Sequence, residues 1–77
     1  MKDTLHTLIA SIVAFPDDVS ISETEEEGVV SLTITVNPTD MGRIIGKNGK
    51  VIRSIRNVMK IPAIKQNKRV DINLSEV

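Results

Sequence analysis

Three of the chain's four glycines lie within eight residues, in the stretch Gly42–Gly49 of a sequence of 77 residues. Glycine weakens helices and permits backbone conformations that other residues rarely adopt, so this group predicts a sharp turn. Apolar residues at helical spacing follow it: Val51, Ile52, Ile55, Val58 and Met59. We therefore expect a glycine loop between two helices. The first is short, capped by Thr39 or Asp40, and the second ends at Pro62.

The other segments predict one more helix and three strands. Residues 3–14 place apolar side chains on one face of a helix. Apolar and polar residues alternate in three further segments, 19–22, 30–36 and 70–74. The first two strands are joined as a hairpin through an acidic turn. The order α-β-β-α-α-β predicts an α+β fold, in which a three-stranded sheet carries three helices packed on one face.

Length and composition restrict the classes of function. A chain of 77 residues has room for one hydrophobic core, so we expect a single domain over residues 1–77. The absence of cysteine excludes disulfides and thiol catalysis. Because no carboxylate pair or histidine cluster suggests enzyme chemistry, we expect no catalysis, no metal and no other cofactor. No apolar run has the length of a membrane span and the start is unlike a signal peptide, which favours a cytoplasmic protein.

The formal net charge of zero hides a division of the chain into two halves. Residues 1–40 hold one lysine against eight acidic residues, a net charge of −7, whereas residues 41–77 hold nine basic residues against two acidic ones, a net charge of +7. A basic half of this kind suits contact with a polyanion. Mutual neutralisation of the two halves within the fold explains the pattern equally well.

Two common phosphate-binding motifs do not fit the glycine loop. A Walker A loop places four residues between its glycines and a Ser or Thr after its lysine, but Gly42 and Gly46 are separated by three residues and Lys47 precedes Asn48. A dinucleotide-binding G-x-G-x-x-G would need a glycine at Ile44. Nucleotide hydrolysis and hydride transfer therefore lose their main support.

The sequence Gly46-Lys47-Asn48-Gly49 remains, between two expected helices. Two glycines leave no side chain between the backbone and a ligand. The loop leads into a helix N-terminus, where amide N–H groups and the helix dipole favour an anion, and Lys47 and Lys50 add positive charge. This arrangement suits a sugar-phosphate backbone that runs past the loop.

The segment "IIGKNGKVI" resembles the GxxG signature of KH domains, in which a loop between two helices clamps single-stranded RNA or DNA. The α-β-β-α-α-β order resembles the type II arrangement of that fold. The resemblance covers essentially the whole chain. It extends to "DMGRIIGKNGKVIRSIRNVM" and to "KRVDINL", and it points to the small bacterial proteins that consist of one KH domain.

The resemblance implies site residues. It implies contact with the nucleic-acid backbone at Gly46, Lys47, Asn48 and Gly49. It also implies that Ile45 and Ile52 support or line the groove for the bases, although the helical phase of Ile52 favours core packing. Proximity to the loop, rather than the signature, places three cations near phosphates: Arg43, Lys50 and Arg53. A solvated helix face is the alternative for Arg53 and for Arg56.

The resulting hypothesis is a non-catalytic RNA-binding protein, a post-transcriptional regulator or RNA chaperone. Single-stranded RNA is the expected partner, with single-stranded DNA as an alternative. The resemblance further implies a homodimer, or a heteromer with a second, larger RNA-binding protein that carries a KH domain. A different class of function stays open: a KH fold used for protein–protein interaction or dimerisation, with little intrinsic RNA binding. Lys47 argues against this alternative, because such a loop needs no positive charge.

Overall fold

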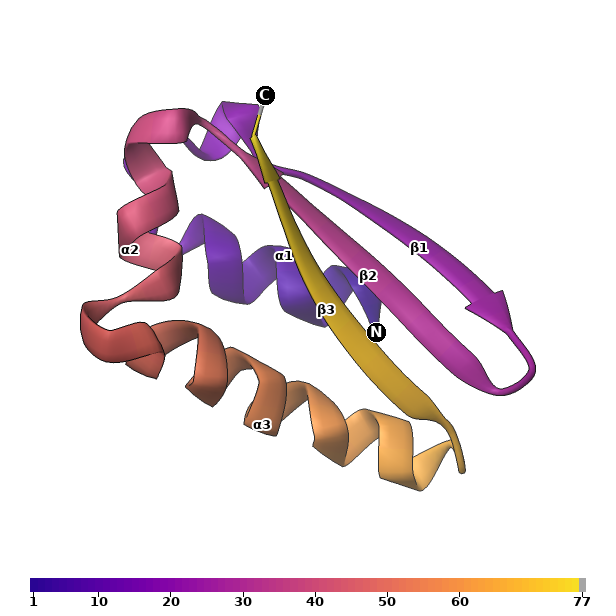
Figure 1. Ribbon diagram of the computed structural model, residues 1–77. Helices are drawn as coiled ribbons and strands as arrows, with labels where there is room; N and C mark the ends of the chain where they lie inside the picture. The colour runs from indigo at the N-terminus through magenta and orange to yellow at the C-terminus, as the bar shows by residue number, and fades with distance from the viewer. Residues whose placement is uncertain (77) are drawn as a thin grey trace.

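The helices and strands follow the predicted order α-β-β-α-α-β in the computed structural model, which describes residues 1–76 (Figure 1). Short 3-10 turns stand between several of them. The elements are α1 (Lys2–Ala10), η1 (Pro16–Asp18), β1 (Ser20–Glu26), β2 (Val29–Val36), η2 (Pro38–Asp40), α2 (Met41–Ile45), η3 (Lys47–Gly49), α3 (Lys50–Lys65) and β3 (Arg69–Glu76).

The three strands form one mixed sheet in the order β1-β2-β3. β1 and β2 are an antiparallel hairpin in which Ile21 lies opposite Ile34. β3 runs parallel to β2, with Ile72 opposite Leu32. A parallel neighbour requires a long crossover, which α2 and α3 provide. This connection leaves β3 at an edge of the sheet, beside α3.

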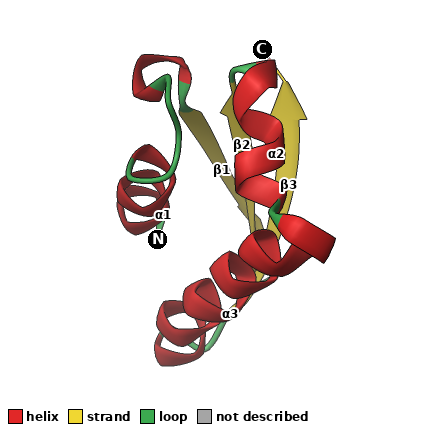
Figure 2. Ribbon diagram, turned by 90° about the vertical axis from the view of Figure 1, so that its left-hand side faces the viewer, coloured by secondary structure: helices red, strands yellow, loops and turns green. Residues whose placement is uncertain are grey.

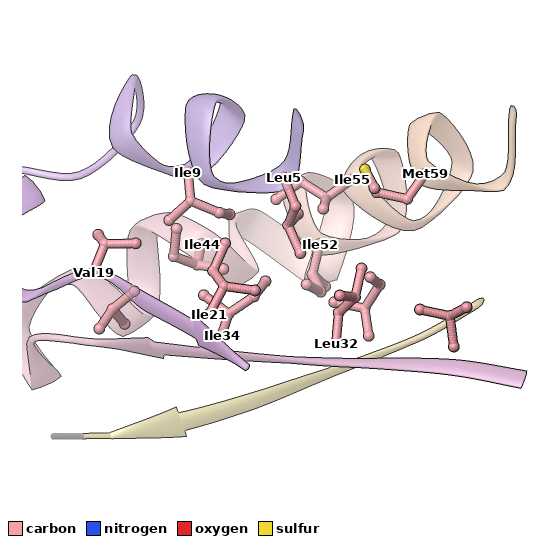
Figure 3. Packing of buried hydrophobic residues seen from close by; sticks show 13 residues of the cluster. Leu5, Ile9, Val19, Ile21, Leu32, Ile34, Ile44, Ile52, Ile55 and Met59 are labelled. Atoms are coloured by element: carbon pink, nitrogen blue, oxygen red, sulfur yellow. The ribbon is translucent and has the colours of Figure 1, made fainter. Parts of the chain in front are cut away.

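All three helices pack against one face of the sheet, as Figures 2 and 3 show. The strict alternation of β2 turns one set of its side chains toward the helices, and these are fully buried. The core cluster consists of Leu5, Ile9, Val19, Ile21, Val30, Leu32, Ile34, Val36, Ile44, Ile52, Ile55, Met59 and Ile72. The predicted α+β class and the one-sided helix layer are therefore confirmed.

α3 continues past Pro62, so the prediction that this proline ends the helix is wrong. Proline removes one helical N–H and crowds the preceding turn. Here the last turn is stabilised by burial, because the Ala63 side chain is 2% exposed, and the Ala63 carbonyl accepts the Lys68 N–H at 2.8 Å. The helix ends at Lys65.

The first helix is shorter than predicted, since α1 ends at Ala10 rather than residue 14. The N–H groups of Ala14 and Phe15 donate instead to the carboxylate of Asp40, at 3.0 and 3.1 Å. Phe15, the chain's single aromatic residue, is 48% exposed and does not belong to the core. Within residues 1–76, no helix is both long and apolar enough to cross a membrane.

Asp40 occupies the N-cap position of α2, as predicted, but its side chain makes no capping hydrogen bond there. Its carboxylate is buried and accepts hydrogen bonds from the two backbone N–H groups after α1 described above. Asn37 caps the preceding 3-10 turn η2, because its side-chain oxygen accepts the N–H of Thr39 at 2.9 Å. The buried carboxylate thus ties the start of α2 to the end of α1.

Candidate nucleic-acid interface

The connection between α2 and α3 turns sharply through three residues with positive φ. Gly46 has φ 74° and ψ 174°, Asn48 has φ 57° and ψ 26°, and Gly49 has φ 73° and ψ 17°. Only glycine adopts the first of these conformations readily, and asparagine is among the residues that tolerate the second. The loop lies at the left-hand edge of Figure 1, at the end of the helical layer.

Gly46 is required for a second reason, which is its close packing on α3. A Cβ atom at this position would lie 2.8 Å from Cβ of Val51 and 2.9 Å from its backbone nitrogen. The N–H of Gly46 closes α2 by donating to Gly42 O at 2.8 Å. The glycine therefore lets the end of α2 pack directly against the first turn of α3. At Gly49 a Cβ would meet nothing within 4 Å, so only its φ favours glycine.

The polar side chains of the loop point outward. Lys47, Asn48 and Lys50 are exposed. Gly49 is the N-cap of α3, which has 16 residues, and no side chain caps this helix end. The first N–H groups of a helix lack intrahelical partners and carry the positive end of its dipole. The loop thus combines two cations with the anion-attracting end of the longest helix.

The structure places the two predicted arginines differently. Arg53 lies one turn into α3, and its guanidinium donates to the backbone oxygen of Asn48 at 3.4 Å, directly beside the loop. Arg43 is drawn toward Asp40, with 3.5 Å between its Nε and the carboxylate, while its side chain remains 61% exposed. Arg53 therefore belongs to the loop surface, whereas Arg43 is partly committed to a structural ion pair.

The two predicted isoleucines differ in their exposure to solvent. Ile52 is 7% exposed and belongs to the core, as its helical phase predicted. Ile45 is 38% exposed at the end of α2, next to Gly46. Of these two, only Ile45 is accessible to a ligand. The neighbouring Ile44 is fully buried and packs in the core between the helices and the sheet, as Figure 3 shows.

A groove between α3 and the edge strand β3 extends from Arg53, and sequence reasoning did not find it. Its volume is about 370 Å³, and it is lined by Arg53, Arg56, Asn57, Lys60, Val70, Asp71, Ile72 and Asn73. The cations occur at positions 53, 56 and 60 of one helix, a spacing that predicts a shared face. Nothing in the sequence indicated that β3 would lie opposite them.

Two ion pairs join the acidic and basic halves among residues 1–75, whose side chains the structure describes. Lys68 Nζ lies 2.7 Å from Glu25 Oε1, and Arg43 pairs with Asp40. Neither pair uses Lys47 or Lys50. Mutual neutralisation therefore accounts for only part of the charge division, and the described loop keeps its positive charge at the surface.

An α-β-β-α-α-β fold with a GxxG loop between its second and third helices defines a KH domain of type II. The family model described as "KhpA/KhpB, KH domain" matches residues 2–74, and the chain belongs to this family.

Several curated relatives resemble the chain along nearly its whole length. The protein named "RNA-binding protein KhpA" of Clostridium acetobutylicum is 43% identical, over 96% of this chain and 99% of the relative. Proteins of the same name from Clostridium perfringens and Oceanobacillus iheyensis are 39% and 38% identical with the same coverage. The resemblance stated from the sequence is thereby confirmed.

Proposed function

We propose that this protein is a non-catalytic RNA-binding protein that holds single-stranded RNA at the Gly46–Gly49 loop. One observation carries the proposal: an exposed, positively charged loop, bent by two glycines, opens directly onto the uncapped N-terminus of α3. This geometry favours phosphate groups. The relatives named as RNA-binding proteins support the same conclusion.

Each residue has a proposed role. The backbone of Gly46 and Gly49 approaches the sugar-phosphate chain, while the side chains of Lys47 and Asn48 contact it. Three cations bind neighbouring phosphates, namely Lys50, Arg53 and Arg43. Ile45 offers the first base an apolar surface, and Ile52 supports the loop from the core.

Fluorescence anisotropy with a labelled single-stranded RNA tests the proposal. The probe has about ten nucleotides, because a KH groove contacts about four. The variant is Lys47→Asp combined with Asn48→Asp, which reverses the loop charge and keeps both glycines. A matched control, Lys2→Asp with Thr4→Asp, makes the same change in net charge at exposed positions of α1. Circular dichroism verifies that each variant is folded.

We expect the loop variant to lose binding by tenfold or more, on the order of the loss of two charge-assisted contacts. The α1 control should bind like the wild type. Equal binding by all three proteins, or no binding by the wild type, would contradict the proposed function.

The biological setting is part of the same proposal. We infer a single KH domain over residues 1–77 that acts in the cytoplasm as a post-transcriptional regulator or RNA chaperone. One module with few phosphate contacts binds weakly, and pairing two modules raises the apparent affinity. We therefore propose a homodimer or a complex with a larger KH-containing RNA-binding protein. Single-stranded DNA is the competing ligand to test in parallel.

A second candidate function is a protein-interaction module, which exposed apolar side chains on the helix layer favour. Val58, Ile61 and Ile64 are 43%, 57% and 73% exposed on α3. Val58 also borders an apolar hollow between α3 and the N-terminal segment, lined by Leu8, Ile12, Lys50, Val51, Ser54, Ile55 and Val58. Sedimentation at micromolar concentration should then show self-association without RNA that Ile61→Ser abolishes and Lys65→Ser retains. A wild type that stays monomeric at this concentration would contradict self-association through these side chains.

A further inference from the structure

A second group of cations lies at the far end of α3, opposite the glycine loop. The end of α3 and the β1–β2 turn lie together at the right-hand side of Figure 1, whereas the loop lies at the left. A hollow of about 310 Å³ occurs at this end, and three of its lining residues are cations, Lys60, Lys68 and Arg69. It adjoins the groove that begins at Arg53, because Lys60 lines both.

Lys68 differs from the other two cations of this hollow because a carboxylate neutralises it. Its Nζ donates a hydrogen bond to Oε1 of Glu25 in β1, with an N–O distance of 2.7 Å. Strand alternation places Glu25 on the helix-bearing face of the sheet, on which Ile21 of the same strand is buried. Within residues 1–75, the part of the chain with described side chains, Lys60 and Arg69 form no ion pair.

Backbone hydrogen bonds hold Lys68 beside the hairpin. Its N–H donates to the carbonyl of Ala63 at 2.8 Å, and the N–H of the next residue, Arg69, donates to the carbonyl of Gly28 at 2.9 Å. The turn after α3 is thereby tied to the turn between β1 and β2. Since the lysine stem is flexible, its ammonium can reach either Glu25 or an anion in the hollow.

Glu25 and a phosphate compete for the charge of Lys68, not for its hydrogen-bond donors. An ammonium has three N–H groups, so donors remain after one of them bonds to Glu25. Its single positive charge is balanced, however, and the adjacent carboxylate repels an approaching phosphate. A lysine that is already neutralised within the protein adds little to the counterion release that drives nucleic-acid binding.

We propose that Glu25 is an internal competitor of RNA, which neutralises Lys68 and withholds it from phosphate groups. The inference rests on the proposed RNA-binding function. RNA held at the glycine loop can extend along α3, but at the far end of the helix it meets an ion pair of zero net charge. The contact between Glu25 and Lys68 is thus autoinhibitory, and it limits the affinity for longer RNAs.

Glu25→Gln tests the proposal, because it removes the charge and keeps the size of the side chain. Glu23→Gln is the matched control: Glu23 lies two residues away on the same face of β1, is exposed and forms no ion pair among residues 1–75. Both variants and the wild type are titrated by anisotropy with labelled U4 and U10 RNAs at several potassium chloride concentrations. U4 has the roughly four nucleotides that a KH domain clamps, whereas U10 extends beyond them.

We expect Glu25→Gln to bind U10 about threefold more tightly than Glu23→Gln does, the gain of one exposed ion pair. For U10, the slope of log K against log salt should become more negative by about 0.7, which corresponds to one further phosphate on a single strand. U4 should respond alike to both variants. Adding Lys68→Met should remove the gain in Glu25→Gln, and the same change should weaken the wild type less.

The outcomes separate this inference from the proposed function. Equal U10 affinities and salt slopes for Glu25→Gln and Glu23→Gln would overturn the role of Glu25 and leave RNA binding intact. The same conclusion follows if Lys68→Met weakens the wild type and Glu25→Gln by the same factor, or if U4 gains as much as U10. Binding of neither RNA by the wild type would overturn both the inference and the proposed function.

Discussion

Gly46 lies directly against Val51, so close that a Cβ on the glycine would come within 2.9 Å of the valine's backbone nitrogen. This contact joins the end of α2 to the first turn of α3. Because Val51 is half-buried beside the core, neither its side chain nor its backbone can move aside without disturbing the helix start. The glycine of the loop is thus a packing requirement as well as a conformational one.

Gly46→Ala should therefore destabilise the domain more than Gly49→Ala, although both replace a glycine of positive φ. Strain at φ alone costs about 1 kcal/mol, and the clash with Val51 should raise the cost at Gly46 to about 2–4 kcal/mol. Urea unfolding followed by circular dichroism measures both. Equal losses of stability would show that the packing against Val51 is not the deciding factor.

The buried carboxylate of Asp40 is expected to contribute strongly to stability. Asp40→Ala leaves the N–H groups of Ala14 and Phe15 without their acceptor and should lower the free energy of unfolding by about 2–4 kcal/mol. Asp18→Ala is the comparison, because Asp18 is exposed and accepts a single bond from Asn37. We expect that change to cost less than about 1 kcal/mol. Thermal unfolding that ranks the two variants alike would refute this role of Asp40.

RNA binding should depend on salt in proportion to the phosphates engaged. With about two to four contacts, log K should fall with log salt at a slope of roughly −1.5 to −3. The slope should become less negative when Lys50 is replaced by methionine, because this exposed lysine lies at the start of α3. Anisotropy titrations at several potassium chloride concentrations provide the slope. A value near zero would be inconsistent with a phosphate clamp.

Ile34 and Ile64 allow the same substitution to be compared at a buried and at an exposed position. Ile34 is fully buried in β2, so Ile34→Ala should cost about 2–5 kcal/mol. Ile64 is 73% exposed on α3, and its replacement should change stability by no more than about 0.5 kcal/mol. Denaturation at low protein concentration compares them. A large loss of stability for Ile64→Ala would indicate that this side chain is buried in an assembly.

Much of the fold could be predicted from local patterns. The alternation in residues 30–36 identified β2, and the apolar spacing after Gly49 identified α3. Boundaries were less accurate, since Pro62 lies inside α3 and α1 ends early. In both places the structure shows contacts that the sequence pattern did not indicate: Ala63 is buried, and the carboxylate of Asp40 accepts the N–H groups of Ala14 and Phe15 beyond the end of α1.

The candidate site, like the fold, could be predicted from the sequence only in part. The loop Gly46–Gly49 was evident from the sequence, because glycine spacing and flanking lysines act locally. The groove beside it was not, because it depends on Arg56 and Ile72, which meet only when β3 pairs with β2.

The sequence by itself thus determined the order of the elements, the two-layer class and the glycine loop, since each follows from the periodicity or backbone freedom of neighbouring residues. Only the tertiary structure decided which carboxylate is buried, how far α3 extends and which residues line the groove. These features arise from contacts between residues distant along the chain, whose meeting is set by strand register and helix packing.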